Sequence, residues 1–382
     1  MATTAKIEVQ EQNPLAALQE LCRSILHSGD IQALLVPTRL PEQGGIMPTL
    51  ITEPAQMDQV DPLAPCFALN AAKLVSRLTR GEVRGKIGAV LRPCEVRAFV
   101  ELVKLNQGNM DYVLLISMDC FGALSNADFQ ALLREKSMSE ITDSYLQALM
   151  QGPEALEQEF ELARACTICE HPQAEAADLG ICLAGLDISS QILLKAHTPR
   201  GEGLLSRMGY EDHTEPNEHQ KALESLQERR AAARDELLEA TREATQDLNK
   251  LRQYLSGCVN CYNCRVACPV CYCRECVFNT DVFEHQPNQY LGWACRQGSL
   301  KMPTDTVFFH LTRLAHMSLS CIGCGQCSNA CPNNIPVMEL FRSTAQRTQE
   351  AFGYQPGLDP DQPIPLTVFA EQEFEDVVDH LA

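Results

Sequence analysis

The chain has 382 residues, which is long enough for two or three domains and at least one large core. It carries 31 basic and 50 acidic residues, and a surface with a net charge of −19 repels nucleic acid phosphates and anionic membranes. The amino-terminus lacks the pattern of a secretory signal, and no apolar run is long enough to span a bilayer. We therefore expect a soluble, cytoplasmic protein of a reducing compartment, whose 19 cysteines are metal ligands or redox groups rather than disulfides.

Residues 1–212 are predicted to form an α/β domain. Three short apolar runs, at 85–91, 111–118 and 176–188, have the composition of buried strands, and the segment after the first run has helical periodicity. Helical spacers between such runs are typical of βαβ units, so we expect a mostly parallel sheet.

The rest of the chain divides into three further regions. Residues 213–256 lack Gly and mix both charge signs with Leu and Ala at helical spacing, which predicts a long solvated helix that acts as a rigid connector. Residues 257–345 hold most of the cysteines, and residues 346–382 form an acidic, proline-containing tail, either a wrapping arm or partly disordered.

The same cysteine motif, C-x2-C-x2-C-x3-C-P, occurs twice, beginning at Cys258 and at Cys321. This is the bacterial ferredoxin spacing, in which three cysteines bind one cubane and the fourth binds the other cluster. The spacing therefore predicts one 4Fe–4S cluster on Cys258, Cys261, Cys264 and Cys331, and a second on Cys321, Cys324, Cys327 and Cys268.

Zinc is the alternative for paired C-x2-C motifs, but four cysteines in a row that end in proline, twice over, favour iron and sulfur. The 52 residues between the motifs include a helical pattern at 308–320, which indicates an α-helical dicluster ferredoxin domain. A further cluster on Cys271, Cys273, Cys276 and Cys295 is one interpretation of the remaining cysteines, and small buried filler is the other.

Four more cysteines are candidates for a third cluster. Cys94 and Cys120 each follow a predicted strand, and Cys166 and Cys169 precede a third. Ligands in open α/β sheets collect beyond the carboxyl ends of the strands, so these four thiols are predicted to meet at one edge of the sheet. Scattered core cysteines are the alternative.

The segments "GKIGAVLRPCEVRAFVEL", "DYVLLISMDCFG" and "CTICEHPQAEAADLGICLAG" resemble the beta-subunit family of deazaflavin-reducing hydrogenases and formate dehydrogenases. The resemblance implies FAD, several 4Fe–4S clusters and a place in a complex with other oxidoreductase subunits. "PEQGGIMPTLIT" at 41–52 looks like the family's Gly-Gly flavin loop, which makes Gly44 and Gly45 candidate flavin contacts. Weaker candidates are Asn70, Arg92 and Arg97.

The sequence thus predicts an oxidoreductase subunit in which FAD exchanges a hydride with a diffusible two-electron carrier such as a deazaflavin. Single electrons would then pass through the clusters to a partner subunit. One alternative is a flavin-free, ferredoxin-like relay or docking subunit of a heterodisulfide reductase-like or dehydrogenase complex. Another is a stand-alone reductase of an organic substrate.

Overall fold

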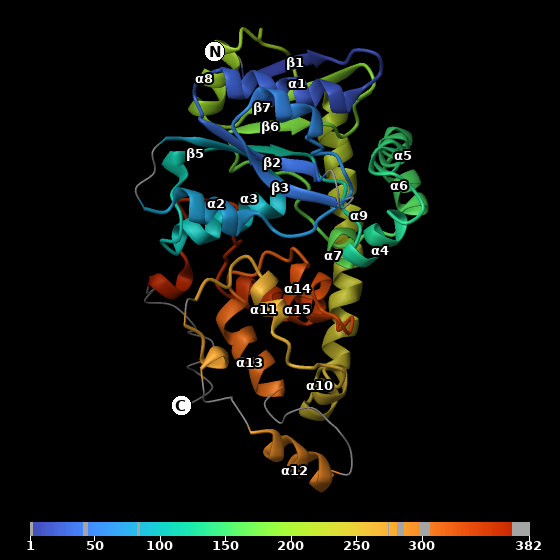
Figure 1. The fold of residues 1–382 in the computed structure, drawn as a ribbon, viewed down its shortest axis with the longest axis vertical. Helices are drawn as coiled ribbons and strands as arrows, with labels where there is room; N and C mark the ends of the chain where they lie inside the picture. The colour runs from blue at the N-terminus through green and yellow to red at the C-terminus, as the bar shows by residue number, and fades with distance from the viewer. Residues whose placement is uncertain are drawn as a thin grey trace.

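The structure is a computed structural model that describes residues 3–40, 45–81, 85–273, 275–280, 286–297 and 306–368. An α/β sheet domain comes first, and a helical region that contains both cysteine motifs follows it (Figure 1). The predicted succession of an α/β domain and a mainly helical carboxy-terminal region is therefore confirmed.

The secondary structure elements have the following bounds. The strands are β1 (Thr4–Glu8), β2 (Ala33–Leu40), β3 (Gly45–Ile51), β4 (Ile87–Leu91), β5 (Val113–Met118), β6 (Leu179–Cys182) and β7 (Gln191–Ala196). The helices are α1 (Pro14–His27), α2 (Ala72–Thr79), α3 (Pro93–Lys104), α4 (Asn126–Leu132), α5 (Met138–Gln151), α6 (Pro153–Glu159), α7 (Arg164–Thr167), α8 (Pro199–Arg207), α9 (Asn217–Ala244), α10 (Leu248–Tyr254), α11 (Asn263–Ala267), α12 (Pro287–Gln297), α13 (Thr306–Met317), α14 (Gln326–Asn329) and α15 (Val337–Ala351). Short 3-10 segments are η1 (Pro54–Gln59), η2 (Met110–Tyr112), η3 (Val277–Asn279) and η5 (Pro365–Thr367).

The seven strands form one mixed sheet in the order β1-β7-β6-β5-β4-β2-β3. Its centre is parallel, because β2, β4, β5 and β6 run in the same direction, and β4 and β5 are the predicted strands at 85–91 and 111–118. The pairs β2–β3, β6–β7 and β1–β7 are antiparallel, so the prediction of a mostly parallel sheet holds only for the centre. Sequence periodicity identified β4, β5 and β6, the last within the predicted run at 176–188. It missed β1, β2, β3 and β7, although β2 is a largely buried, parallel strand of the centre.

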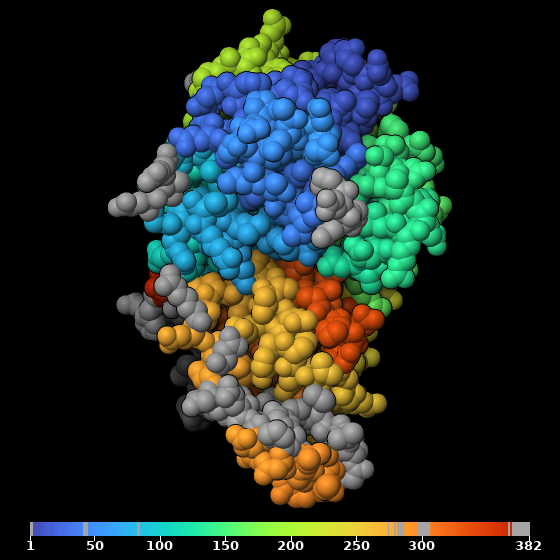
Figure 2. Space-filling model, in the orientation of Figure 1, coloured from blue at the N-terminus to red at the C-terminus, as the bar shows by residue number. Residues whose placement is uncertain are grey.

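Alternating residues of β5 enter two different cores. Leu114, Ile116 and Met118 belong to a core on one face of the sheet. Val113 and Leu115 belong to a second core, which also contains Phe309 of α13 and Phe341 of α15. Because this second core extends into the helical region, the two parts of the molecule pack directly against each other (Figure 2).

Helix α9 lies along both parts of the molecule (Figure 1). Leu223 and Leu226 near its beginning pack in the first core of the α/β domain. Near its end, Arg242 donates to the side chain of Gln346 on α15. This face is buried, so α9 is more than a solvated connector.

Residues after α15 pack back against α3. Tyr354 is buried, and its hydroxyl is hydrogen-bonded to Glu101 of α3. The backbone N–H of Gly357 donates to the same carboxylate at 2.9 Å, and the Arg97 guanidinium of α3 donates to the Pro356 carbonyl at 3.1 Å. The beginning of the predicted tail therefore lies on the α/β domain.

Candidate iron–sulfur sites

The first three cysteines of motif one line a single cavity with the last cysteine of motif two. This cavity is bounded by Cys258, Cys261, Cys264 and Cys331, and by His310 of α13. The structure therefore brings together the predicted first set, including the crossed fourth cysteine. Cys261 is exposed and Cys264 is buried, so this set reaches from the surface into the protein.

The two motifs follow the same backbone path. Asn260 and Tyr262 have φ values of +48° and +60°, and the residues at the same motif positions, Gly323 and Gly325, have φ values of +72° and +76°. A short helix follows in each motif, α11 in the first and α14 in the second. Left-handed residues between the cysteines turn the loop tightly, which lets successive thiols point toward a common centre.

The four cysteines of the predicted second set lie near one another. Burial raises the pKa of the Cys321, Cys324 and Cys327 thiols, and repulsion from the nearby Cys268 thiolate adds to the rise in each case. Cys268 of the first motif therefore lies beside the three cysteines of the second.

The third predicted set surrounds a cavity at the carboxyl ends of β4 and β5. Cys94, Cys120, Cys166 and Cys169 line it, together with Cys324 of the second set. Burial raises the pKa of Cys166 to about 11, and repulsion from Cys120 and Cys169 contributes. Burial raises the pKa of Cys94 further, with repulsion from Cys324 the next cause, so the second and third sets are neighbours.

The cysteine sets are accompanied by three buried cations, of which the sequence analysis named only Arg97, and that one as a flavin contact. The guanidinium groups of Arg97, Arg230 and Arg313 are 1–3% exposed, and none has a carboxylate within 4 Å in the described part of the chain. Each lies beside cysteines: Arg97 near Cys94 and Cys169, Arg230 near Cys166 and Cys169, and Arg313 near Cys264 and Cys268.

These cations provide a test of whether a cluster fits. A buried charge is costly unless a counter-charge accompanies it, and a cluster held by four thiolates supplies negative charge and sulfur acceptors. Buried donors without an acceptor in the described residues include Asn70 Nδ2, Arg230 Nε, Arg313 Nε and His310 Nδ1. All four side chains lie beside a cysteine set, so the donor sets suit anionic clusters.

Four of the five predicted flavin contacts lie in the described residues. Gly45 begins β3 and pairs with Leu40, while Gly44 lies outside the described residues. Arg92 donates to the carbonyls of Ala64 and Cys66, and is close to Cys120. Asn70 lies beside Cys324, and Arg97 lies near Cys94. These three side chains surround cysteine sets.

The other predicted cysteines are less closely grouped. Cys271 is near Cys268 and Cys273, and burial raises its pKa to about 11. Cys273 and Cys295 are exposed, and Cys276 is half-buried. Nothing in the described residues brings Cys276 or Cys295 to the other two, and a further cluster on these cysteines stays a prediction.

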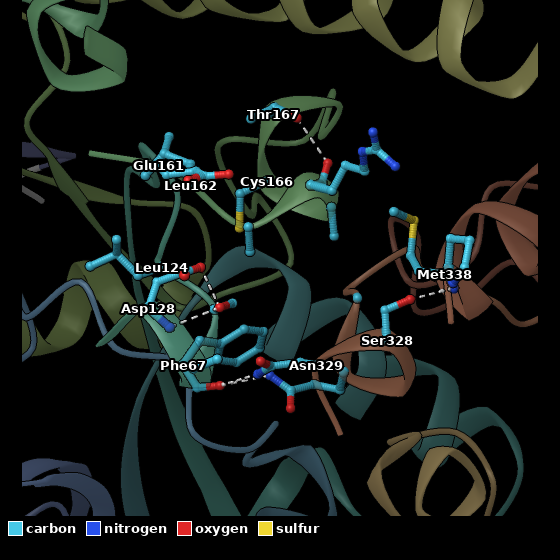
Figure 3. Close-up of a pocket in the computed structure, with 18 of the residues that line it drawn as sticks. Phe67, Leu124, Asp128, Glu161, Leu162, Cys166, Thr167, Ser328, Asn329 and Met338 are labelled. Carbon is cyan, nitrogen blue, oxygen red and sulfur yellow. Dashed lines mark hydrogen bonds between the residues drawn. The ribbon is translucent and has the colours of Figure 1, made fainter. Parts of the chain in front are cut away.

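A cleft of about 820 Å³ lies between the α/β domain and the helical region, and Cys166 lies in its wall (Figure 3). Cys324 also lines this cleft. On one side, the Asn329 amide of α14 donates to the Phe67 carbonyl at 3.2 Å (Figure 3). Its described lining carries four carboxylates and one guanidinium: Asp128, Glu157, Glu161, Glu339 and Arg164.

Among the described residues, no group of three or more His, Cys, Asp or Glu is arranged to hold a single metal ion. None of the described helices is long and apolar enough to cross a membrane.

Comparison with known proteins places this geometry in context. The "4Fe-4S binding domain" profile matches residues 318–337, which include the second motif. The F420-dependent formate dehydrogenase subunit beta of Methanocaldococcus jannaschii is 27% identical over 341 residues, which cover 83% of this chain and 85% of that protein. The F420-dependent formate dehydrogenase 1 subunit beta of Methanococcus maripaludis is 25% identical over 377 residues, or 92% of each chain.

Among solved structures, a chain of the F420-reducing [NiFe] hydrogenase complex from Methanosarcina barkeri aligns with a TM-score of 0.46 and 14% identity. That alignment covers 65% of this chain and 94% of the other. Over most of its length the chain is similar to the beta subunits of F420-dependent formate dehydrogenases, and the family resemblance predicted from the sequence is confirmed.

Proposed function

We propose that the chain is an iron–sulfur electron-transfer subunit of an oxidoreductase complex. The observation that supports this proposal is that the cysteines of each predicted set lie close together, with the fourth cysteine of each ferredoxin motif near the first three of the other motif. A 4Fe–4S cluster, when bound, takes up and releases one electron at a time. The cysteines of this chain would hold the clusters, and its buried guanidinium groups would offset their negative charge.

The three sets follow one another through the molecule. The first set opens to the surface at Cys261, and Arg313 lies near cysteines of both the first and the second set. Cys324 of the second set adjoins Cys94 of the third. This order supports electron transfer between a partner subunit that docks on the helical region and a redox group that binds near the α/β domain. The relatives are beta subunits of formate dehydrogenases, which makes other oxidoreductase subunits the expected partners.

A second candidate function adds FAD and hydride exchange with a deazaflavin. The cleft favours it, because the cleft has the size of a cofactor site and its wall includes cysteines of two sets. Its four carboxylates disfavour the phosphates of FAD, so the described cleft suits a planar ring better than a whole dinucleotide. The relay is therefore our first proposal, and FAD is the part to be tested separately.

Composition after anaerobic purification tests both candidates. Three filled sets predict about twelve irons and as many acid-labile sulfides per chain, at four of each per cluster. About one flavin per chain, with bleaching on addition of reduced deazaflavin, would favour the hydride-exchanging subunit. Twelve irons without flavin would favour the relay. Fewer than about eight irons after reconstitution would refute the proposal, because the two ferredoxin motifs alone account for eight.

A further inference from the structure

Helix α13 presents a buried polar face to the first cysteine set. His310 Nε2 lies 3.4 Å from Cys258 Sγ. Arg313, about one turn later, donates from Nη1 to Cys264 Sγ at 3.1 Å and from Nη2 to the Cys264 carbonyl at 3.2 Å. One side chain thus holds both the sulfur and the backbone of the same predicted ligand.

Arg313 is fixed in position by aromatic rings rather than by a carboxylate. Its guanidinium lies 5.5 Å from the ring centroid of Phe309 on α13 and 4.6 Å from that of Phe341 on α15. The side chain is 3% exposed. Contacts with two rings and a carbonyl limit its motion, and its burial reduces screening by salt.

The same charge reaches cysteines of both ferredoxin-type sets. Burial by itself would lower the pKa of Arg313, but the nearby thiolates of Cys264, Cys268 and Cys327 raise it. Cys264 belongs to the first set, while Cys268 and Cys327 belong to the second. Arg313 therefore lies near cysteines of both predicted ferredoxin-type sets.

We propose that Arg313 is a positioning residue that raises the reduction potentials of the two ferredoxin-type clusters, most of all that of the cluster on Cys264. Reduction adds one electron to a cluster and makes or breaks no bond. A fixed positive charge and a hydrogen bond to a ligand sulfur stabilise the more negative, reduced form. This inference rests on the proposed function, because it requires that both sets hold clusters.

The test is a dithionite titration of the full chain, followed by electron paramagnetic resonance, with Arg313→Gln compared with Arg230→Gln. Arg230 is the matched control, because it is equally buried but donates to the carbonyls of Cys120 and Phe121 beside the third set. In R313Q we expect the equilibrium constant for reduction to fall about tenfold, or about 59 mV for one electron, at two of the three clusters. In R230Q only the remaining cluster should shift.

Iron and sulfide per chain are measured on every variant. The inference is overturned if R313Q keeps its full iron content and has the midpoint potentials of the wild type. It is also overturned if R313Q changes the midpoint potential of the same cluster as R230Q. If R313Q loses iron, the same titration is carried out on the Arg313→Lys variant. The lysine keeps the charge but cannot make the paired hydrogen bonds to the sulfur and the carbonyl of Cys264. We therefore expect the midpoint potentials of the same two clusters to fall by less than in R313Q, and unchanged midpoint potentials overturn the inference. Wild-type protein without iron would instead defeat the proposed function itself.

Discussion

Replacing Cys94 with alanine tests the third cysteine set, the one that no ferredoxin spacing predicts. Cys94 follows β4, and its thiol lines the same cavity as Cys120, Cys166 and Cys169. A cluster held by three protein thiols is labile, so we expect this variant to lose the third cluster and keep the other two. The expected iron content falls from about twelve to about eight per chain, at four irons per cluster.

The assay is anaerobic iron and sulfide analysis with an absorbance spectrum of the same sample. Cys22→Ala is the matched control, because Cys22 is a thiol of the α/β domain that is 2% exposed and belongs to no predicted set. Both variants remove one sulfur from the α/β domain, so any general loss of stability should appear in both. Iron should stay at about twelve in C22A.

The reasoning fails if C94A keeps about twelve irons per chain, because Cys94 then ligates nothing. It also fails if wild-type protein holds only about eight irons after reconstitution, since the four thiols are then a structural group. A fall to about four in C94A would mean that the neighbouring second set, which approaches Cys94 through Cys324, depends on the third.

Two further predictions concern stability. His219 of α9 is fully buried, with Nε2 2.8 Å from Asp119 and Nδ1 2.7 Å from Glu215, so His219→Leu should cost about 3–5 kcal/mol in denaturant unfolding. Burial alone would lower the pKa of His219, but its bonds to Asp119 and Cys182 raise it from 6.5 to about 11. The contribution of His219 to the free energy of unfolding is therefore complete below pH 6.5 and declines toward pH 11. If the stability of H219L declined equally steeply over this pH range, the assignment would be contradicted. Gly325 has φ +76° and an added Cβ would lie 2.4 Å from the Ala165 side chain, whereas Gly209 has the same φ and nothing within 4 Å. Gly325→Ala should therefore lower the melting temperature more than Gly209→Ala, which carries only the backbone strain of about 1–2 kcal/mol, and equal decreases would refute the role of the contact.

The cysteine sets were predictable because two of their signals are local. The crossed ferredoxin pattern depends on spacing within a few residues, and the left-handed residues at its turns occur at the same positions in both copies. Cys94 and Cys120 were predictable because both follow parallel strands, whose carboxyl ends share one edge of the sheet.

The surroundings of the sets were not predictable, because they depend on contacts between distant parts of the chain. Arg230 on α9 reaches the carbonyl of Cys120 over 110 residues, and Arg97 reaches that of Ile322 over 225 residues. Nothing near Arg230 in the sequence marks it as a neighbour of sulfur, whereas Arg97 follows Cys94 by three residues on α3. Arg97 was predicted only as a weaker candidate flavin contact.

The contact between the α/β domain and the helical region is itself part of the proposed relay. Gln326 and Asn329 of α14 both donate to the Phe67 carbonyl, at 2.8 and 3.2 Å, immediately beside Cys324 and Cys327. Arg97 joins α3 to the carbonyl of Ile322, in the second motif. The spacing between the second and third sets is therefore set by direct hydrogen bonds across the interface, and α9 adds a further link. Hinge motion between the α/β domain and the helical region would change the distance between the second and third sets. The hydrogen bonds across the interface oppose such motion.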